Sequence, residues 1–219
     1  SNADENMMGL KQLPRLENGE IDNFSLALIG RQLGLNAVVT GSLDDIGILE
    51  ELRGMIWKDT HHLIQILASI EVYDTESGSK ILDESFSRKV EIEDLDYELM
   101  RSEGKLILPD LNETLTDLLA EIGESICWAI EDQPWNGFVV AVEDDIITIS
   151  SGSIAGLSPG DEFNVFDTSR VLKGVSGQQF FIRGQKIGEI KITEVEPDTA
   201  RAVVITNRGI KPGSSVRVK

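Results

Sequence analysis

The pattern of apolar residues changes abruptly at Pro134, and this change constrains the fold more than any other feature of the sequence. Before it, residues 112–130 place leucine or isoleucine at spacings of mostly three and four, which predicts a long amphipathic helix. After it, short runs of alternating apolar and polar residues are separated by Gly, Pro and Asp, which is typical of a small barrel or sandwich. The sequence therefore predicts an α+β protein with an all-β second part.

Upstream of Pro134 the sequence predicts an α/β sandwich, in which helices cover a sheet that contains a long β-hairpin. Apolar residues alternate from Ile64 to Val72, the pattern of a strand with one buried face. A polar turn and a second strand-like run follow, so the two runs form a hairpin. The predicted elements are a helix over 24–33, a strand over 36–43, hairpin strands over 62–73 and 80–90 around the turn 74–79, and the helix over 112–130.

Downstream of Pro134 the sequence predicts a small all-β barrel. Short strands with regular turn punctuation leave no room for a helix of several turns. The segment 167–178 is the longest stretch without a pattern, and we expect an irregular surface loop there. The predicted strands cover 138–142, 146–150, 162–166, 179–182, 186–195, 199–205 and 214–218.

The charge of the chain divides at the same boundary. Residues 1–134 hold 28 Asp and Glu against 10 Lys and Arg, whereas residues 135–219 hold 10 of each. An acidic first domain repels phosphate backbones and anionic lipids, so we expect no nucleic-acid partner. The predicted domains are a lead-in over 1–22, an acidic α/β domain over 23–133 and an all-β domain over 135–219.

The start of the chain and its single cysteine limit the conclusions about location. Ser1-Asn2-Ala3 is typical of the remnant of a cleaved expression tag, so an upstream signal peptide or lipid-anchor cysteine stays open. Cys127 cannot form an intrachain disulfide, and we expect it to be a core or half-buried residue. The sequence has no run of about 18 apolar residues, so we expect no transmembrane segment.

Residue types that carry catalysis or hold metals are sparse. His61 and His62 are adjacent in a predicted strand, so they point to opposite faces and cannot share one metal. The sequence Asp-x-Glu-x-Gly at 74–78 lacks the remaining ligands of a calcium loop and is better explained as a hairpin turn. The acidic residues at 93–96 are typical of a helix N-terminus. We therefore expect no enzymatic activity, no cofactor and no metal site.

We expect contacts with partner proteins on the electrically neutral β domain. Its predicted surface loop combines cationic and apolar side chains, and a tryptophan lies at the domain junction, where large aromatic side chains often anchor interfaces. Packing between the two domains is the alternative explanation for this tryptophan and for Trp128. The expected contact residues are Arg170, Val171, Leu172, Lys173 and Trp135.

The first part of the chain resembles a known family. The segment 33–42 reads Leu-Gly-Leu-Asn-Ala-Val-Val-Thr-Gly-Ser, and a long hairpin with Val-Tyr-Asp-Thr at 72–75 follows it. This combination resembles the periplasmic α/β domain of curli-secretion-channel lipoproteins (the CsgG type). It is also similar to the middle domain of the flagellar assembly protein T (FlgT) and to TolB N-terminal-like domains. The resemblance implies that Gly41 ends the strand and that the Asp-Thr pair starts the hairpin turn.

The second part is similar to the C-terminal β domain of FlgT-like proteins. The similarity lies in Gly-Leu-Ser-Pro-Gly-Asp at 156–161, Gly184, Ile-Gly at 187–188 and Ile-Lys-Pro-Gly at 210–213. Glycine permits the tight turn in the first motif and a close approach of two backbones in the third. The resemblance implies a non-enzymatic assembly or scaffold protein of the periplasm or outer membrane, and flagellar assembly is one of the roles that it implies. Its implied partners are envelope or flagellar proteins or further copies of the chain, and its implied anchor is a lipid on a removed N-terminus.

Two other classes of function stay open on the sequence. The acidic α/β domain could belong to a soluble regulatory protein that binds a small molecule or a cation. A hydrolase is the third class, although the sequence offers no pairing of a nucleophile with a base.

Overall fold

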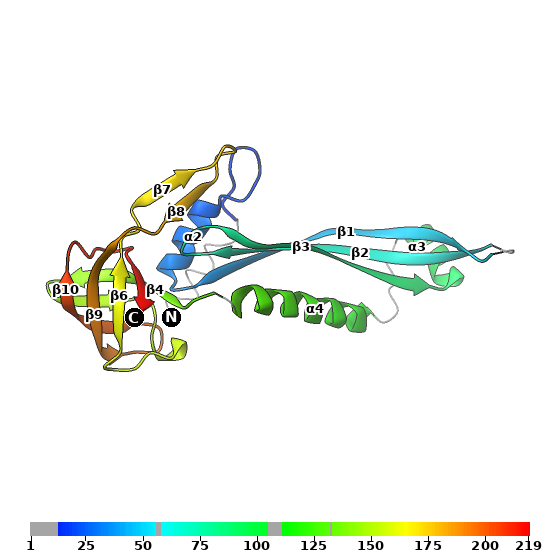
Figure 1. Cartoon of the computed structure of the whole chain (residues 1–219). Coiled ribbons are helices and arrows are strands. Elements are labelled where there is room, and N and C mark those ends of the chain that lie inside the picture. Colours follow the sequence, from blue (N-terminus) through cyan, green and yellow to red (C-terminus); the bar gives the residue numbers. More distant parts are fainter. Residues whose placement is uncertain (1–12, 56–57, 105–110, 132) are drawn as a thin grey trace. The chain divides into compact units, whose positions relative to one another are not determined.

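The computed structural model describes residues 13–55, 58–104, 111–131 and 133–219 (Figure 1). It is an α+β protein with a three-stranded sheet, a closed barrel of six strands and a separate two-stranded sheet, which confirms the predicted fold class. The chain divides into two compact units. The barrel unit comprises Ser1–Val38, Tyr73–Ile81 and Gln133–Lys219, and the sheet unit comprises Val39–Val72 and Leu82–Asp132. The predicted domain boundaries stay a prediction, since this spatial division follows other residues.

Helix α2 (Asn23–Gln32) begins and ends where local chemistry requires. Its N-cap Asp22 accepts a hydrogen bond from the Ser25 backbone N–H at 3.1 Å, which satisfies one of the donors that a first turn leaves open. The helix ends before Gly34, which has a φ of +71°. A Cβ atom there would also lie 2.0 Å from the Ser150 carbonyl oxygen. Glycine is therefore required both by the left-handed backbone conformation and by this close contact.

The sheet unit is built on three long strands in the order β1 (Ala37–Arg53), β2 (Asp59–Asp74) and β3 (Lys80–Ile92). Ser69 of β2 lies against Ser85 of β3, and Gln65 lies against Ser87, so these two strands are antiparallel. Residues at even positions from Ile64 to Val72 are buried, as the alternation predicts.

Two helices complete the sheet unit: α3 (Asp94–Glu103) and α4 (Leu111–Glu131). Leu118 and Ile122 of α4 are buried, and Arg88 of β3 forms an ion pair with Glu121 of the same helix. The predicted helix over 112–130 is thereby confirmed. The acidic cluster at 93–96 is a helix N-terminus as predicted, because α3 begins directly after Glu93 with two acidic residues in its first turn.

The length of β1 departs from the sequence prediction. The resemblance implied that Gly41 ends this strand, yet β1 continues through Gly41 and Gly47 to Arg53. Two aspartates and two glycines disfavour a strand locally. Pairing with the long neighbour β2 overrides that preference, because each added residue of β1 satisfies further backbone donors and acceptors.

The barrel closes in the order β10-β5-β4-β11-β6-β9, as the predicted all-β second part requires. Its core contains the fully buried Ile147, Ile149, Val165 and Ile190. Gly188 allows a close crossing, because a side chain there would lie 2.6 Å from the Thr206 carbonyl oxygen. The strands are β4 (Asn136–Glu143), β5 (Ile146–Ile149), β6 (Glu162–Phe166), β9 (Lys186–Val195), β10 (Ala200–Asn207) and β11 (Ser215–Val218), with a 3₁₀ turn η2 (Ser153–Ala155) before β6.

The segment 167–178 is not wholly irregular, contrary to the prediction. Strand β7 (Arg170–Lys173) pairs antiparallel with β8 (Gln179–Ile182), and the two form their own sheet outside the barrel. The prediction of β8 as a barrel strand is therefore wrong as well. Four-residue strands carry too little alternation to reveal their partner, and pairing here depends on the return of the chain at Gly177.

Candidate functional site

Several segments of the barrel unit form hydrogen bonds with the turn of the β2–β3 hairpin. Thr75 is fully buried, and its backbone N–H and its hydroxyl both donate to the Asn36 carbonyl at 3.0 Å. Asp74 accepts backbone hydrogen bonds from Glu76 and Ser77 at 3.1 and 2.8 Å. The Asp-Thr pair therefore starts the turn, as the resemblance implied. The contact with Asn36 also brings together the two sequence segments that carry the resemblance.

The carboxylate of Glu76 lies at the centre of a group of cations. It accepts hydrogen bonds from Arg217 Nε at 3.0 Å, from the Ser215 hydroxyl at 3.1 Å and from Arg183 Nε at 3.3 Å. The side chains of Glu76 and Arg217 are 10% and 15% exposed, whereas that of Arg183 is 45% exposed. Burial lowers the pKa of Arg217, and the charge of Asp74 opposes that shift. With these donors around it, Glu76 is arranged to hold the turn.

Arg31 of α2 is a second buried cation at the same turn. Its Nε donates to the Thr75 carbonyl at 2.8 Å, and its Nη2 donates to the Glu76 carbonyl. The guanidinium also lies over the Phe181 ring, 3.6 Å from its centroid. Burial lowers the pKa of Arg31 to about 10, against the opposing charge of Asp74. This arrangement fixes α2 to the turn and to β8, and it explains why a charged residue occupies a buried helix position.

The two histidines have separate partners in the sheet unit. His61 Nδ1 lies 2.6 Å from Glu91 Oε1, and His62 Nδ1 lies 3.0 Å from Asp94 Oδ1. The His62 ring also stacks on Tyr97 at a centroid distance of 3.7 Å. The structure does not bring the histidines together, and in the described segments of the chain no group of three or more His, Cys, Asp or Glu side chains is placed to hold a metal ion.

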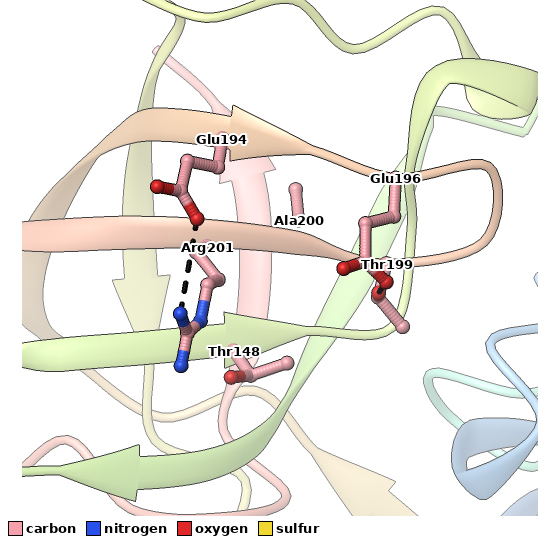
Figure 2. A pocket seen from close by; sticks show the side chains of 6 residues that line it. All are labelled: Thr148, Glu194, Glu196, Thr199, Ala200 and Arg201. Atoms are coloured by element: carbon pink, nitrogen blue, oxygen red, sulfur yellow. Dashed lines mark hydrogen bonds and ion pairs between the residues drawn. The ribbon is translucent and has the colours of Figure 1, made fainter.

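A shallow polar pocket lies on the barrel, over the turn between β9 and β10 (Figure 2). It is lined by Thr148, Glu194, Glu196, Thr199, Ala200 and Arg201. Arg201 Nη1 lies 3.8 Å from Glu194 Oε2, and the Thr199 hydroxyl donates to Glu196 Oε2 at 3.3 Å. Each carboxylate therefore has a partner from the pocket wall.

The predicted contact residues of the loop lie together on β7, and all four are exposed. Leu172 is 56% exposed, and Val175 at the hairpin tip is fully exposed. The hairpin is held from its other strand: Phe181 of β8 stacks on Phe24 of α2 at a centroid distance of 4.4 Å. The Asn23 amide also donates to the Gln179 carbonyl at 2.7 Å. One strand thus anchors the hairpin while the other displays its side chains.

The tryptophans and the cysteine occupy different environments. Trp135 is half-buried and packs against Phe163 of the barrel core at 5.1 Å, so much of its ring is unavailable to a partner. Trp128 of α4 is 78% exposed. Cys127 is exposed too, so its prediction as a core or half-buried residue is wrong. On the α4 helix Cys127 lies on the face opposite the buried Leu118 and Ile122, and Trp128 lies at the side of that face.

Sequence reasoning missed two features that the structure makes prominent. The Glu76 cluster joins positions more than a hundred residues apart, and no local pattern signals it. The exposed edge of β1 was missed because the predicted strand covered only 36–43, and the resemblance implied an end at Gly41. A signal for Arg31 did exist: with Asn23, Leu26, Ala27 and Gly30 it falls at the spacing of one helix face.

Within the described ranges, none of the helices combines the length and the apolar composition needed to cross a membrane. Comparison with known protein families finds none that matches the sequence, and comparison with curated proteins finds no match either.

Proposed function

We propose that the protein is a non-enzymatic assembly or scaffold protein that binds partner proteins through exposed strands. The observation that carries the proposal is the β7–β8 hairpin. Its outer strand exposes Val171 and Leu172 between two cations, Arg170 and Lys173. The backbone of this strand is already fixed by its pairing with β8. A partner that covers its apolar side chains therefore causes little further loss of conformational entropy, which favours binding.

The charges of the hairpin support the same function. Among the described residues, Arg170 and Lys173 have no ion pair, so both stay available to a partner carboxylate. An exposed strand edge also offers unpaired backbone donors and acceptors, which a partner strand can use. Val175 at the tip adds an apolar side chain beyond the strand.

The setting of this assembly role is the bacterial envelope. The motifs at 33–42 and 156–161 resemble those of periplasmic and outer-membrane-associated assembly proteins, including flagellar ones. On this resemblance we infer that the protein acts in the periplasm, with envelope or flagellar proteins as its partners.

A pull-down from the envelope fraction of the source organism tests the proposal, with the purified chain as bait. Leu172→Glu should reduce the recovery of the captured envelope protein by about tenfold, because it places a charge in a desolvated contact. Ile154→Glu is the matched control, since Ile154 is 78% exposed in the same unit but lies on η2. Equal capture by both variants, or no captured envelope protein, would contradict the assignment.

A further inference from the structure

The outer edge of β1 has the composition of a strand that receives a partner strand. β1 ends the order β1-β2-β3, so one of its two sides pairs with no strand in the described part of the chain. Most of its 17 residues are exposed. Leu43 and Leu52 are 61% and 64% exposed, and Ile46 and Ile48 are about 40% exposed. The edge therefore offers a long row of backbone donors and acceptors beside exposed apolar side chains.

The two edges of the sheet carry different charges. Lysine and arginine on an edge strand discourage the addition of a further strand, as proline does. β3 carries Lys80, Arg88 and Lys89 along 13 residues, and Arg88 forms an ion pair with α4. β1 has no lysine and no proline, and its one arginine, Arg53, lies at its end in ion pairs with Glu51 and Glu91.

Charge determines which kind of strand the edge of β1 can receive. The strand holds two acidic pairs, Asp44-Asp45 and Glu50-Glu51. The sheet unit as a whole contains 21 Asp and Glu against 6 Lys and Arg, counted over Val39–Val72 and Leu82–Asp132. Two copies of β1 paired antiparallel about the midpoint between Gly47 and Ile48 would place Asp44 against Glu51 and Asp45 against Glu50, and like charges directly opposite are destabilising. The favoured occupant therefore has lysine or arginine at these positions.

We propose that β1 binds an extended, basic segment of a partner protein by strand addition, with Lys or Arg beside the two acidic pairs and apolar side chains beside Leu43, Ile46 and Ile48. Backbone hydrogen bonds supply the register of this contact, and charge supplies its selectivity. This inference goes beyond the proposed function, because it assigns a second surface with its own partner chemistry. It does not depend on the β7–β8 hairpin.

Synthetic peptides test the inference on the purified full chain. The probe is a labelled peptide in which two Lys-Lys pairs are separated by a run of valines as long as Ile46–Leu49 and are flanked by valine, which matches the spacing of the two acidic pairs. Its binding is followed by fluorescence anisotropy. We expect binding that weakens about tenfold when glutamate replaces lysine, because like charges then face each other. A peptide with every lysine kept but prolines in place of alternate valines should also bind about tenfold more weakly, because proline cannot donate to the ladder.

Two variants with the same change of charge locate the binding site. Leu43→Lys should weaken binding of the valine–lysine peptide about tenfold, because it places a lysine on the receiving edge. Leu119→Lys should leave the affinity within about twofold, since Leu119 is 64% exposed in the same unit but lies on α4. Amide exchange of both variants should match that of the wild type, which shows that the sheet is intact.

Several outcomes would overturn the inference. The absence of peptide binding would do so, as would equal binding of the proline peptide, because charge alone would then explain the affinity. An equal loss in Leu119→Lys would show that the contact is not on β1. Dimers in sedimentation experiments that Leu43→Lys abolishes would identify a second copy as the occupant. None of these measurements uses the β7–β8 hairpin, so a failure here is distinguishable from a failure of the proposed function.

Discussion

The two exposed edge strands of this protein, β1 and β7, differ in length, charge and support. β1 is 17 residues long and carries four acidic residues and one arginine, whereas β7 is four residues long and carries two cations and no acid. An edge strand is an open site for pairing, and its charge determines which strands it accepts. Because the two edges carry opposite charges, a partner strand whose charge suits one edge is repelled by the other.

The support of the two strands differs in kind as well. β1 rests on β2, and polar side chains reinforce the pairing: Asp44 accepts hydrogen bonds from Ser42 at 2.6 Å and from Ser69. β7 rests on β8, which aromatic stacking and the cluster around Glu76 hold to the rest of the barrel unit. Changes at these two supports should therefore affect one edge and spare the other.

The largest effect should follow from Glu76→Gln. The change leaves the half-buried Arg217 without its carboxylate, so we expect the free energy of unfolding of the barrel unit to fall by about 3 kcal/mol. Urea unfolding followed by tryptophan fluorescence measures the loss, and amide exchange in β1 should stay at the wild-type rate. Glu194→Gln is the control: its ion pair with Arg201 is exposed and 3.8 Å long, so we expect a loss below about 0.5 kcal/mol. Equal losses would show that the Glu76 cluster is not a main support of the unit.

A smaller and more local effect should follow from Phe181→Ala. The change removes the stacking on Phe24 and the contact with Arg31, and we expect it to destabilise the attachment of the hairpin by about 2 kcal/mol. Hydrogen exchange should become faster at the amides of β7 and β8 and stay unchanged in β1. Leu172→Ala, on the exposed strand of the same hairpin, should cost less than about 0.5 kcal/mol. Faster exchange in β1 as well as in β7 would contradict the separate support of these two strands.

The smallest effect concerns the acidic edge and depends on pH. Hydrogen bonds from Ser42 and Ser69 lower the pKa of Asp44 below its ordinary value of 3.8. A carboxylate with a lowered pKa in the folded state stabilises that state above the unfolded value, and the contribution is lost as the pH falls through the lowered pKa. Thermal unfolding between pH 5 and about pH 2 should therefore show a weaker pH dependence in Asp44→Asn. Asp45→Asn removes a neighbouring charge from the same strand, and it should keep more of that dependence; identical profiles would contradict the role of Asp44.

Much of the fold follows from local patterns that the sequence displays. The α4 stripe, the alternation of β2 and the turn at Asp74 each place the cause within a few residues of the effect. The barrel strands also follow from alternation and turn glycines, and their buried residues are the inward-facing set. These elements are predictable because burial of one face makes apolar residues recur with the period of a helix or of a strand.

The candidate surfaces are less predictable from the sequence. Arg170 to Lys173 were expected to be exposed contact residues, but their place in a strand depends on pairing with β8. The receiving edge of β1 depends on the length of β2, because local preference would have ended the strand near Gly41. In both cases the length or the place of a strand depends on the neighbouring strand, and the strand's own residues do not determine it.

By itself the sequence determined the α+β class, the acidic character of one part of the chain and the turn chemistry of the hairpin. The tertiary structure alone decided which strands became edges, how far β1 extends and where the carboxylate of Glu76 finds its arginines. The physical reason is the range of the interactions. Periodicity and turn preference act between near neighbours, whereas strand pairing and the compensation of a buried charge join residues that are distant in the chain.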